Sequence, residues 1–324
     1  MLKIGIIGIG GMGNVHINNI ELIDFAEVSA LCDISPSAKD KAEEIGAKLF
    51  TDIEQMLRET RLDAVCVCTP SFLHYDHIKK VVSAGVNAIS EKPLALNSRH
   101  AKELFDIADK NKAMIFVAHV IRFWDEYAML REIVFDKRYG EVLDAEFLRL
   151  SACPKWIKGG WLFDKNKSGH IPFDLHIHDL DFLISLFGKP EEYSFTSSGG
   201  GGRDFKEHYR FTYYYPDKVV AAQASWYNAD YPFTAAFRVY FKNAVVEYDS
   251  DKLMVYGKDA KPVQLESKTK IEVDTGINVP ATGAYYNELL HFLECIRDKK
   301  ESDMFKREEL IAVIEILEEI NKEI

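Results

Sequence analysis

The sequence predicts an α/β protein of two domains. Residues 1–120 should form a doubly wound parallel sheet, and residues 121–324 an α+β domain with a large, mostly antiparallel, open-faced sheet. Three observations support this prediction. The first third alternates apolar β-runs with helical patterns, the glycine cluster GIGGMG follows the first run, and the later β-runs are joined by tight turns. At 324 residues the chain is long enough for two packed cores.

The N-terminal domain is predicted from β-runs that are apolar along their whole length. Such runs are typical of parallel strands covered by helices on both faces. The runs occupy residues 2–7, 27–32, 63–68, 86–90 and 113–120, and helices are expected at 14–23, 35–46, 72–85 and 98–111. A further short helix is expected to begin at a capping box formed by Thr51 and Glu54. Cys66 and Cys68 point to the same side of one strand, where core packing is the expected role.

The C-terminal domain is predicted from consecutive β-runs framed by helices. Strands are expected at residues 141–151, 209–215, 219–229, 234–241 and 244–250, and helices at about 124–135, 171–188, 284–298 and 307–324. The run SSGGGG, residues 197–202, leads into no helix, so we expect a hairpin loop and not a phosphate site.

Composition excludes several classes of partner. The net charge of −11 and the scattered basic residues argue against nucleic acid. No apolar run is long enough to span a bilayer, and the N-terminus shows no secretory leader. Five cysteines, few and odd in number, fit a reducing compartment, so a cytoplasmic protein is expected.

The glycine cluster predicts a dinucleotide site. A strand–glycine loop–helix order lets the backbone approach a pyrophosphate at the helix N-terminus, and the loop comprises Gly8, Ile9, Gly10, Gly11, Met12 and Gly13. Asp33, 20 residues after Gly13, ends the next strand and can accept hydrogen bonds from ribose hydroxyls. Because this carboxylate would repel a 2'-phosphate and no basic residue follows before Lys39, NAD is expected over NADP.

Two further strand ends should line the nicotinamide half of this site, because ligands of open α/β sheets bind beyond the carboxyl ends of strands. The segments are CTPSFLH and SEKPLAL, and the residues expected to contact the cofactor are Thr69, Pro70, His74, Glu91 and Lys92. The bond between Lys92 and Pro93 is a candidate cis peptide.

These motifs, with IRF followed by YGEV, SGHIPFDLHIHDLDFLISLFG and AYYNELLHFL, resemble the glucose-fructose oxidoreductase, inositol 2-dehydrogenase and MocA family (Gfo/Idh/MocA) in order over nearly the whole chain. The resemblance implies an NAD(P)-dependent oxidoreductase acting on a secondary alcohol of a sugar or cyclic polyol. It implies that Lys92, Asp174 and His178 are the catalytic residues. On a helix Asp174 and His178 are four residues apart on one face, so the carboxylate can orient the imidazole as general base, and Lys92 would stabilise the oxyanion.

The chain departs from the family pattern at His176, where many relatives have glycine, and in a reduced glycine run before it. A core or supporting role is expected for His176, with substrate contact as the alternative. Asp179 and Asp181 are expected at the helix surface or a domain interface. A zinc site at His176 and His178 is the rival interpretation, but on a helix these rings point about 200° apart. No metal is therefore expected.

Substrate contacts beyond this set are expected from aromatic and basic residues, namely Arg122, Trp156, Trp161, His176 and Tyr285. The second sheet carries apolar and aromatic residues on both faces, which predicts a homodimer or homotetramer paired through it, as in relatives. Two alternative functions stay open: an NAD-dependent glycoside hydrolase that uses transient oxidation, and a non-catalytic NAD-binding regulator. The joint presence of Lys92, Asp174 and His178 argues against the regulator.

Overall fold

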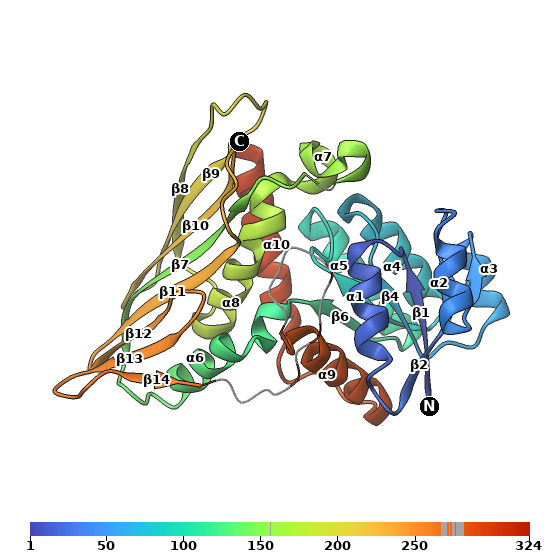
Figure 1. Ribbon diagram of the computed structural model, residues 1–324, viewed down its shortest axis with the longest axis horizontal. Helices are drawn as coiled ribbons and strands as arrows, with labels where there is room; N and C mark the ends of the chain where they lie inside the picture. Colours follow the sequence, from blue (N-terminus) through green and yellow to red (C-terminus); the bar gives the residue numbers. More distant parts are fainter. Residues whose placement is uncertain (156, 267–270, 272, 274–275, 277–281) are drawn as a thin grey trace. The chain divides into compact units, whose positions relative to one another are not determined.

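The computed structural model describes residues 1–155, 157–266, 271, 273, 276 and 282–324 (Figure 1). The chain forms two compact units. The first comprises residues 1–120, 166–168 and 271–307, and the second comprises residues 121–165, 169–270 and 308–324. Trp156, one of the expected substrate residues, lies outside the described residues.

The first unit contains a six-stranded parallel sheet in the order β3-β2-β1-β4-β5-β6, which confirms the doubly wound prediction. Its strands are β1 (Leu2–Ile7), β2 (Ala26–Cys32), β3 (Lys48–Phe50), β4 (Ala64–Val67), β5 (Asn87–Glu91) and β6 (Ile115–Ala118). All four residues of β4 are buried, as expected of a central strand that is covered on both faces.

The helices that cover this sheet are α1 (Gly11–Ile20), α2 (Ala38–Ile45), α3 (Ile53–Glu59), α4 (His74–Ser83), α5 (Ser98–Asn111) and α9 (Ala284–Asp298), and α9 packs against α1 (Figure 1). A side chain caps the N-terminus of two of them, α3 and α5. The expected capping residue of α3 was wrong by one position: Asp52, and not Thr51, accepts a hydrogen bond from the Gln55 N–H at 2.7 Å. Asn97 caps α5 in the same way.

The second unit contains an eight-stranded sheet in the order β14-β13-β12-β11-β7-β10-β9-β8, antiparallel apart from the β7–β10 pair. Its strands are β7 (Val142–Ala152), β8 (Glu192–Ser198), β9 (His208–Tyr214), β10 (Val219–Tyr227), β11 (Thr234–Phe241), β12 (Ala244–Tyr248), β13 (Leu253–Gly257) and β14 (Val263–Leu265). The glycine run joins β8 to β9, so the predicted hairpin loop is confirmed.

One face of this sheet is covered by α6 (Asp125–Phe135), α8 (Ile177–Phe187) and α10 (Arg307–Glu323) (Figure 1). Tyr127 of α6 lies edge-on to Phe182 of α8 and Phe237 of β11, so an aromatic cluster joins the layers. In β11 the side chains alternate between the two faces: Phe237 is buried, whereas Arg238 and Tyr240 lie on the opposite, exposed face.

Short helical segments lie between β7 and α8. The short helix α7 (Lys165–Ser168) precedes the segment that carries the candidate acid–base pair, and a 3₁₀ segment (Lys158–Phe163) precedes α7. Within the part of the chain that the structure describes, no helix combines the length and the apolarity needed to cross a bilayer.

Candidate functional site

The glycine loop between β1 and α1 has the geometry of a phosphate-binding turn. Gly8 has a φ of +88°, and a Cβ at Gly13 would stand 2.1 Å from the Gly8 carbonyl oxygen, so the fold itself requires these two glycines. Gly10 is different: apart from its own two neighbours in the chain, no described residue has an atom within 4 Å of where its Cβ would be, and the residue is exposed. The absence of a side chain at Gly10 therefore leaves open space before the N-terminus of α1, which suits close approach by a pyrophosphate.

Asp33 lies at the carboxyl end of β2 beside this loop. Its Oδ2 accepts a hydrogen bond from the Ile9 N–H at 2.5 Å, and its Oδ1 accepts one from the Ser35 N–H at 2.7 Å. The carboxylate is thus held against the glycine loop and remains half-exposed, with lone pairs left to accept from ribose hydroxyls. The residues of the loop and Asp33 fit a bound dinucleotide.

The segment after β4 supplies Thr69 and Pro70, both half-buried. The Thr69 hydroxyl contacts Nδ1 of His77 at 3.1 Å. His74, which was expected to contact the cofactor, is 1% exposed, and both of its ring nitrogens face backbone carbonyls inside the first unit. Its ring therefore holds the backbone of this region instead of presenting a free polar edge.

Lys92 stands out in the segment after β5. Of residues 88–95, all of which the structure describes, Lys92 is the one that is not buried. The Lys92–Pro93 bond is cis, as predicted. Glu91 points inward: its Oε1 lies 2.9 Å from Nε2 of buried His16, so this carboxylate is paired within the protein. His16 was not singled out in the sequence, although its place three residues after Gly13 on α1 was a usable signal.

Asp174 and His178 show the same pattern in the second unit. Of residues 171–184, every one of which is described, these two alone are half-buried and the rest are buried. The local structure corrects the expected uniform α-helix, because Pro172–His176 forms a π-helical turn and α8 follows it. The wider turn still leaves Asp174 and His178 as the accessible pair, and π turns occur often at functional sites.

His176 belongs to the core of the second unit. Its ring stacks on Phe211 with centroids 3.7 Å apart, and Nε2 lies 2.5 Å from the Tyr213 hydroxyl oxygen. Burial, with a smaller contribution from the Arg149 charge, lowers the pKa of His176 to about 3, so the ring is neutral. These contacts are those of a core residue, the first of the two roles expected for His176. Among the described residues, no group of three His, Cys, Asp or Glu side chains fits a metal ion.

Asp179 and Asp181 were expected at the helix surface or a domain interface; both are fully buried, so the helix-surface alternative was wrong. Asp179 accepts two hydrogen bonds from the Arg149 guanidinium, at 2.6 and 3.2 Å, and Arg149 also bonds the Tyr127 hydroxyl at 3.1 Å. Because an isolated buried charge is costly, these pairs fix α8 against β7 and α6.

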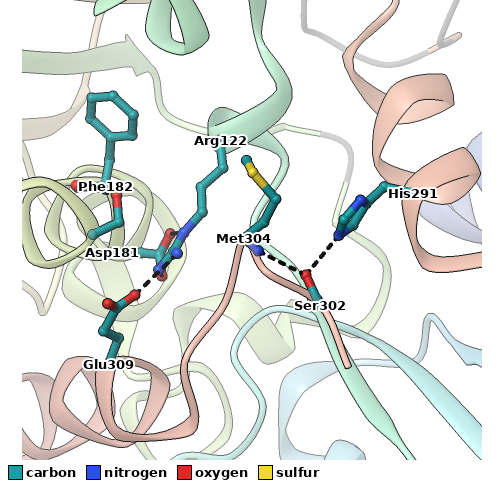
Figure 2. A network of polar contacts seen from close by, with 8 residues as sticks. Arg122, Asp181, Phe182, His291, Ser302, Met304 and Glu309 are labelled. Carbon is teal, nitrogen blue, oxygen red and sulfur yellow. Dashed lines mark hydrogen bonds and ion pairs between the residues drawn. The ribbon is translucent and has the colours of Figure 1, made fainter. Parts of the chain in front are cut away.

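Arg122, which was expected to contact substrate, pairs with the second aspartate. Figure 2 shows its guanidinium between Asp181, at 2.7 and 2.8 Å, and Glu309 of α10, at 3.2 Å. Arg122 is 1% exposed, so its charge is used within the second unit. Of the remaining expected substrate residues, Trp161 lies half-buried in the second unit, and Tyr285 lies half-buried on α9 in the first.

Comparison with known proteins gives two family matches. Residues 2–119 match the model described as "Oxidoreductase family, NAD-binding Rossmann fold", and residues 127–247 match the "GFO/IDH/MocA C-terminal domain". A solved structure of levoglucosan dehydrogenase in complex with NADH and levoglucosan has the same fold, with a TM-score of 0.83 and 18% identity over 99% of this chain and 96% of that one.

Two curated relatives are D-glucoside 3-dehydrogenase of Escherichia coli K12 and myo-inositol 2-dehydrogenase of Thermotoga maritima. The first is 34% identical over 196 residues, 58% of this chain and 55% of the relative. The second is 26% identical over 200 residues, 60% of this chain and 58% of the relative. The chain thus spans little more than half the length of these relatives. Because the two family models together match well over half of the sequence, the chain belongs to the Gfo/Idh/MocA family of NAD-binding oxidoreductases.

Proposed function

We propose that this protein is an NAD-dependent dehydrogenase that transfers a hydride between a secondary alcohol of a sugar or cyclic polyol and nicotinamide. The observation that carries the proposal is the accessibility of Asp174 and His178 within a segment whose other side chains are buried. Lys92 has the same isolated accessibility in its own segment. The names of the two curated relatives, which refer to a glucoside and to an inositol, support this substrate class.

In the proposed mechanism His178 accepts the proton of the substrate hydroxyl when the alcohol is oxidised. Asp174, four residues earlier, orients the imidazole and stabilises its charged form. Lys92 donates a hydrogen bond to the same oxygen and stabilises the negative charge that develops there. In the reverse direction His178 returns the proton. Bound NAD supplies the hydride acceptor at C4 of its nicotinamide ring.

The proposed preference for NAD over NADP rests on Asp33. Its carboxylate is fixed by the backbone N–H groups of Ile9 and Ser35, so it cannot easily turn away from a 2'-phosphate. Ile34, which follows it, is 88% exposed and brings no positive charge. Repulsion between the Asp33 carboxylate and a phosphate dianion would therefore oppose NADP.

We also propose a homodimer or homotetramer that pairs through the uncovered face of the eight-stranded sheet. This face presents Tyr214, Tyr240 and Tyr256, which are 40%, 48% and 39% exposed. Aromatic residues on a broad sheet face are typical of subunit contacts. A cytoplasmic location is proposed because all five cysteines, which the structure describes, are free thiols.

The test is a panel of inositols, hexoses, hexonates and ketosugars assayed with NAD and NADH. With the best substrate, Lys92→Met and His178→Gln should each lower kcat/KM by about 10²-fold or more and leave the Kd for NAD within about threefold. Asp174→Asn should cause a smaller loss. His100→Gln serves as a matched control, since His100 stacks on Tyr75 of the first unit and belongs to no proposed site.

Three results would overturn the proposal. Near wild-type turnover by His178→Gln would remove the assigned base. Release of a sugar from a glycoside without net NADH would identify a glycoside hydrolase that uses transient oxidation. Tight NAD binding without turnover of any member of the panel would favour a regulator.

A further inference from the structure

Two buried histidines hold the residues on either side of Lys92. We propose that His16 and His74 are positioning residues: His16 fixes Glu91 before Lys92, and His74 fixes Pro93 after it. The inference rests on the proposed role of Lys92 in catalysis. It assigns a function to two buried histidines whose rings contact Glu91, Pro93 and Thr69.

The contact before Lys92 is a buried ion pair between His16 and Glu91. His16, on α1, is 0% exposed, and its Nε2 lies 2.9 Å from Oε1 of Glu91. The other oxygen of Glu91 accepts a hydrogen bond from the Lys92 N–H at 3.3 Å. The carboxylate therefore connects the helix that follows the glycine loop to the backbone of Lys92 itself.

The charges of this pair support each other. Burial acts to lower the pKa of His16, but the side chains of Cys68, Cys66 and Glu91 outweigh burial and raise the pKa well above its usual value. Burial acts to raise the pKa of Glu91, but the hydrogen bond and charge of His16 lower the pKa overall. An imidazolium–carboxylate pair results, and removing either partner would leave an uncompensated buried charge.

The contact after Lys92 is a bridge between two loops. Nδ1 of His74 lies 2.7 Å from the Pro93 carbonyl oxygen, and Nε2 lies 2.7 Å from the Thr69 carbonyl oxygen. Thr69 follows β4 and Pro93 follows β5, so one ring at the start of α4 ties together the ends of two neighbouring strands. Both strand ends belong to the proposed nicotinamide-binding region.

The two contacts of His74 depend on the protonation state of its ring. Carbonyl oxygens only accept hydrogen bonds, so both contacts are hydrogen bonds only when both ring nitrogens carry hydrogen, as in the imidazolium. Burial lowers the pKa of His74, whereas the two carbonyls and Glu91 favour the charged ring, and Lys92 opposes it. His77, one turn further along α4, is the other titratable group near His74. As pH rises, one of the two bonds is lost first.

For catalysis, what matters is the distance between the Lys92 ammonium group and the reacting oxygen. Lys92 must place its ammonium group within hydrogen-bond reach of the reacting oxygen, and a shift of about 1 Å can cost about 10²-fold in rate. Because α1, β4 and β5 are joined through His16, Glu91 and His74, the backbone at Lys92 has little freedom to shift.

A double-mutant cycle tests whether these residues act through Lys92. His74→Gln and Glu91→Gln are each made in the wild type and in the Lys92→Met background, with His100→Gln as the control. We expect each to lower kcat/KM by about 10- to 100-fold in the wild type and by less than about threefold in the Lys92→Met background. An equal loss in both backgrounds would indicate a purely structural role and would overturn the proposal, as would no loss in the wild type.

A second measurement requires no activity and keeps a failure of this inference distinct from a failure of the proposed function. In the full-length protein labelled with ¹⁵N at histidine, the His74 resonances are assigned by their loss in His74→Gln. Because burial lowers the pKa of His74, we expect its ring to gain the second ring proton at a lower pH in the folded protein than in the unfolded chain, and we expect the His16 ring to stay charged to higher pH in the wild type than in Glu91→Gln. A His74 ring that titrates at the same pH in the folded protein and in the unfolded chain, or identical titration of His16 in both proteins, would refute the arrangement whether or not a substrate is found.

Discussion

Protonation of His176 should destabilise the second unit in acid, and the His176→Phe variant isolates the effect. The ring is fully buried and has a pKa of about 3, against 6.5 for an exposed histidine. Between pH 6.5 and 3, His176 is therefore protonated in the unfolded chain but neutral in the folded chain. As pH drops through this window, the free energy of unfolding falls. Linkage at about 1.4 kcal/mol per pH unit predicts a loss of about 2 kcal/mol between pH 7 and pH 5 from this residue.

The stability difference between His176→Phe and the wild type should depend on pH. Phenylalanine can keep the stacking on Phe211 but leaves the Tyr213 hydroxyl without its partner, which costs about 1 to 3 kcal/mol at every pH. His176→Phe should therefore be less stable than the wild type at pH 7. At pH 5 the difference in free energy of unfolding between the two proteins should be smaller by about 2 kcal/mol, because phenylalanine does not titrate and the variant lacks the acid destabilisation caused by His176.

Urea unfolding followed by tryptophan fluorescence provides the assay. All four tryptophans lie between residues 124 and 226, so the signal reports the second unit, which contains His176. Other buried histidines contribute equally to both proteins and cancel in the difference. The same pH dependence in wild type and His176→Phe would refute the buried, neutral state of His176.

Three other predictions follow from the described contacts. Wild-type protein should use NAD at least about 10-fold more efficiently than NADP, and Asp33→Ser should reduce this ratio; equal efficiency in the wild type would contradict the role of Asp33. Asp179→Asn should lower the free energy of unfolding by about 3 to 5 kcal/mol, because it leaves the buried Arg149 charge without its ion-pair partner. Glu247→Gln, which breaks the exposed pair with Arg238, should lower it by less than about 1 kcal/mol; similar urea midpoints for the two variants would refute this difference. Light scattering at micromolar concentration should give the mass of a dimer or tetramer, and Tyr240→Asp should weaken the association of the subunits. A monomeric wild type would exclude the sheet-face contact.

Local patterns predicted much of the fold. The spacing from Gly8 to Asp33 identified the β1–α1–β2 unit, because the tight turn and the helix start depend on neighbouring residues. The apolar β-runs predicted most of both sheets. The three-residue strands β3 and β14 and the short strand β13 were missed, since they are too short to show periodicity. The seven-residue strand β8 was not among the expected ranges either.

The errors concern partners that are distant in the sequence. Asp179 and Asp181 were expected near the surface, but they pair with Arg149 and Arg122, which are 30 and 59 residues away. Helical periodicity reports which face a residue occupies, not whether a distant arginine compensates its charge. The π turn at Pro172–His176 has a similar origin, because packing against the sheet decides it.

The segment of residues 171–184 has a further consequence for how such a protein can change in evolution. Twelve of its fourteen side chains are buried, several in ion pairs or ring stacks, and the remaining two are Asp174 and His178. A random substitution here should either disrupt packing or remove the proposed acid–base pair. Few single substitutions in this segment should therefore give a folded, active enzyme with an altered substrate choice. New substrate ranges would have to arise from other parts of the chain, and a library built to retarget the enzyme should leave residues 171–184 untouched.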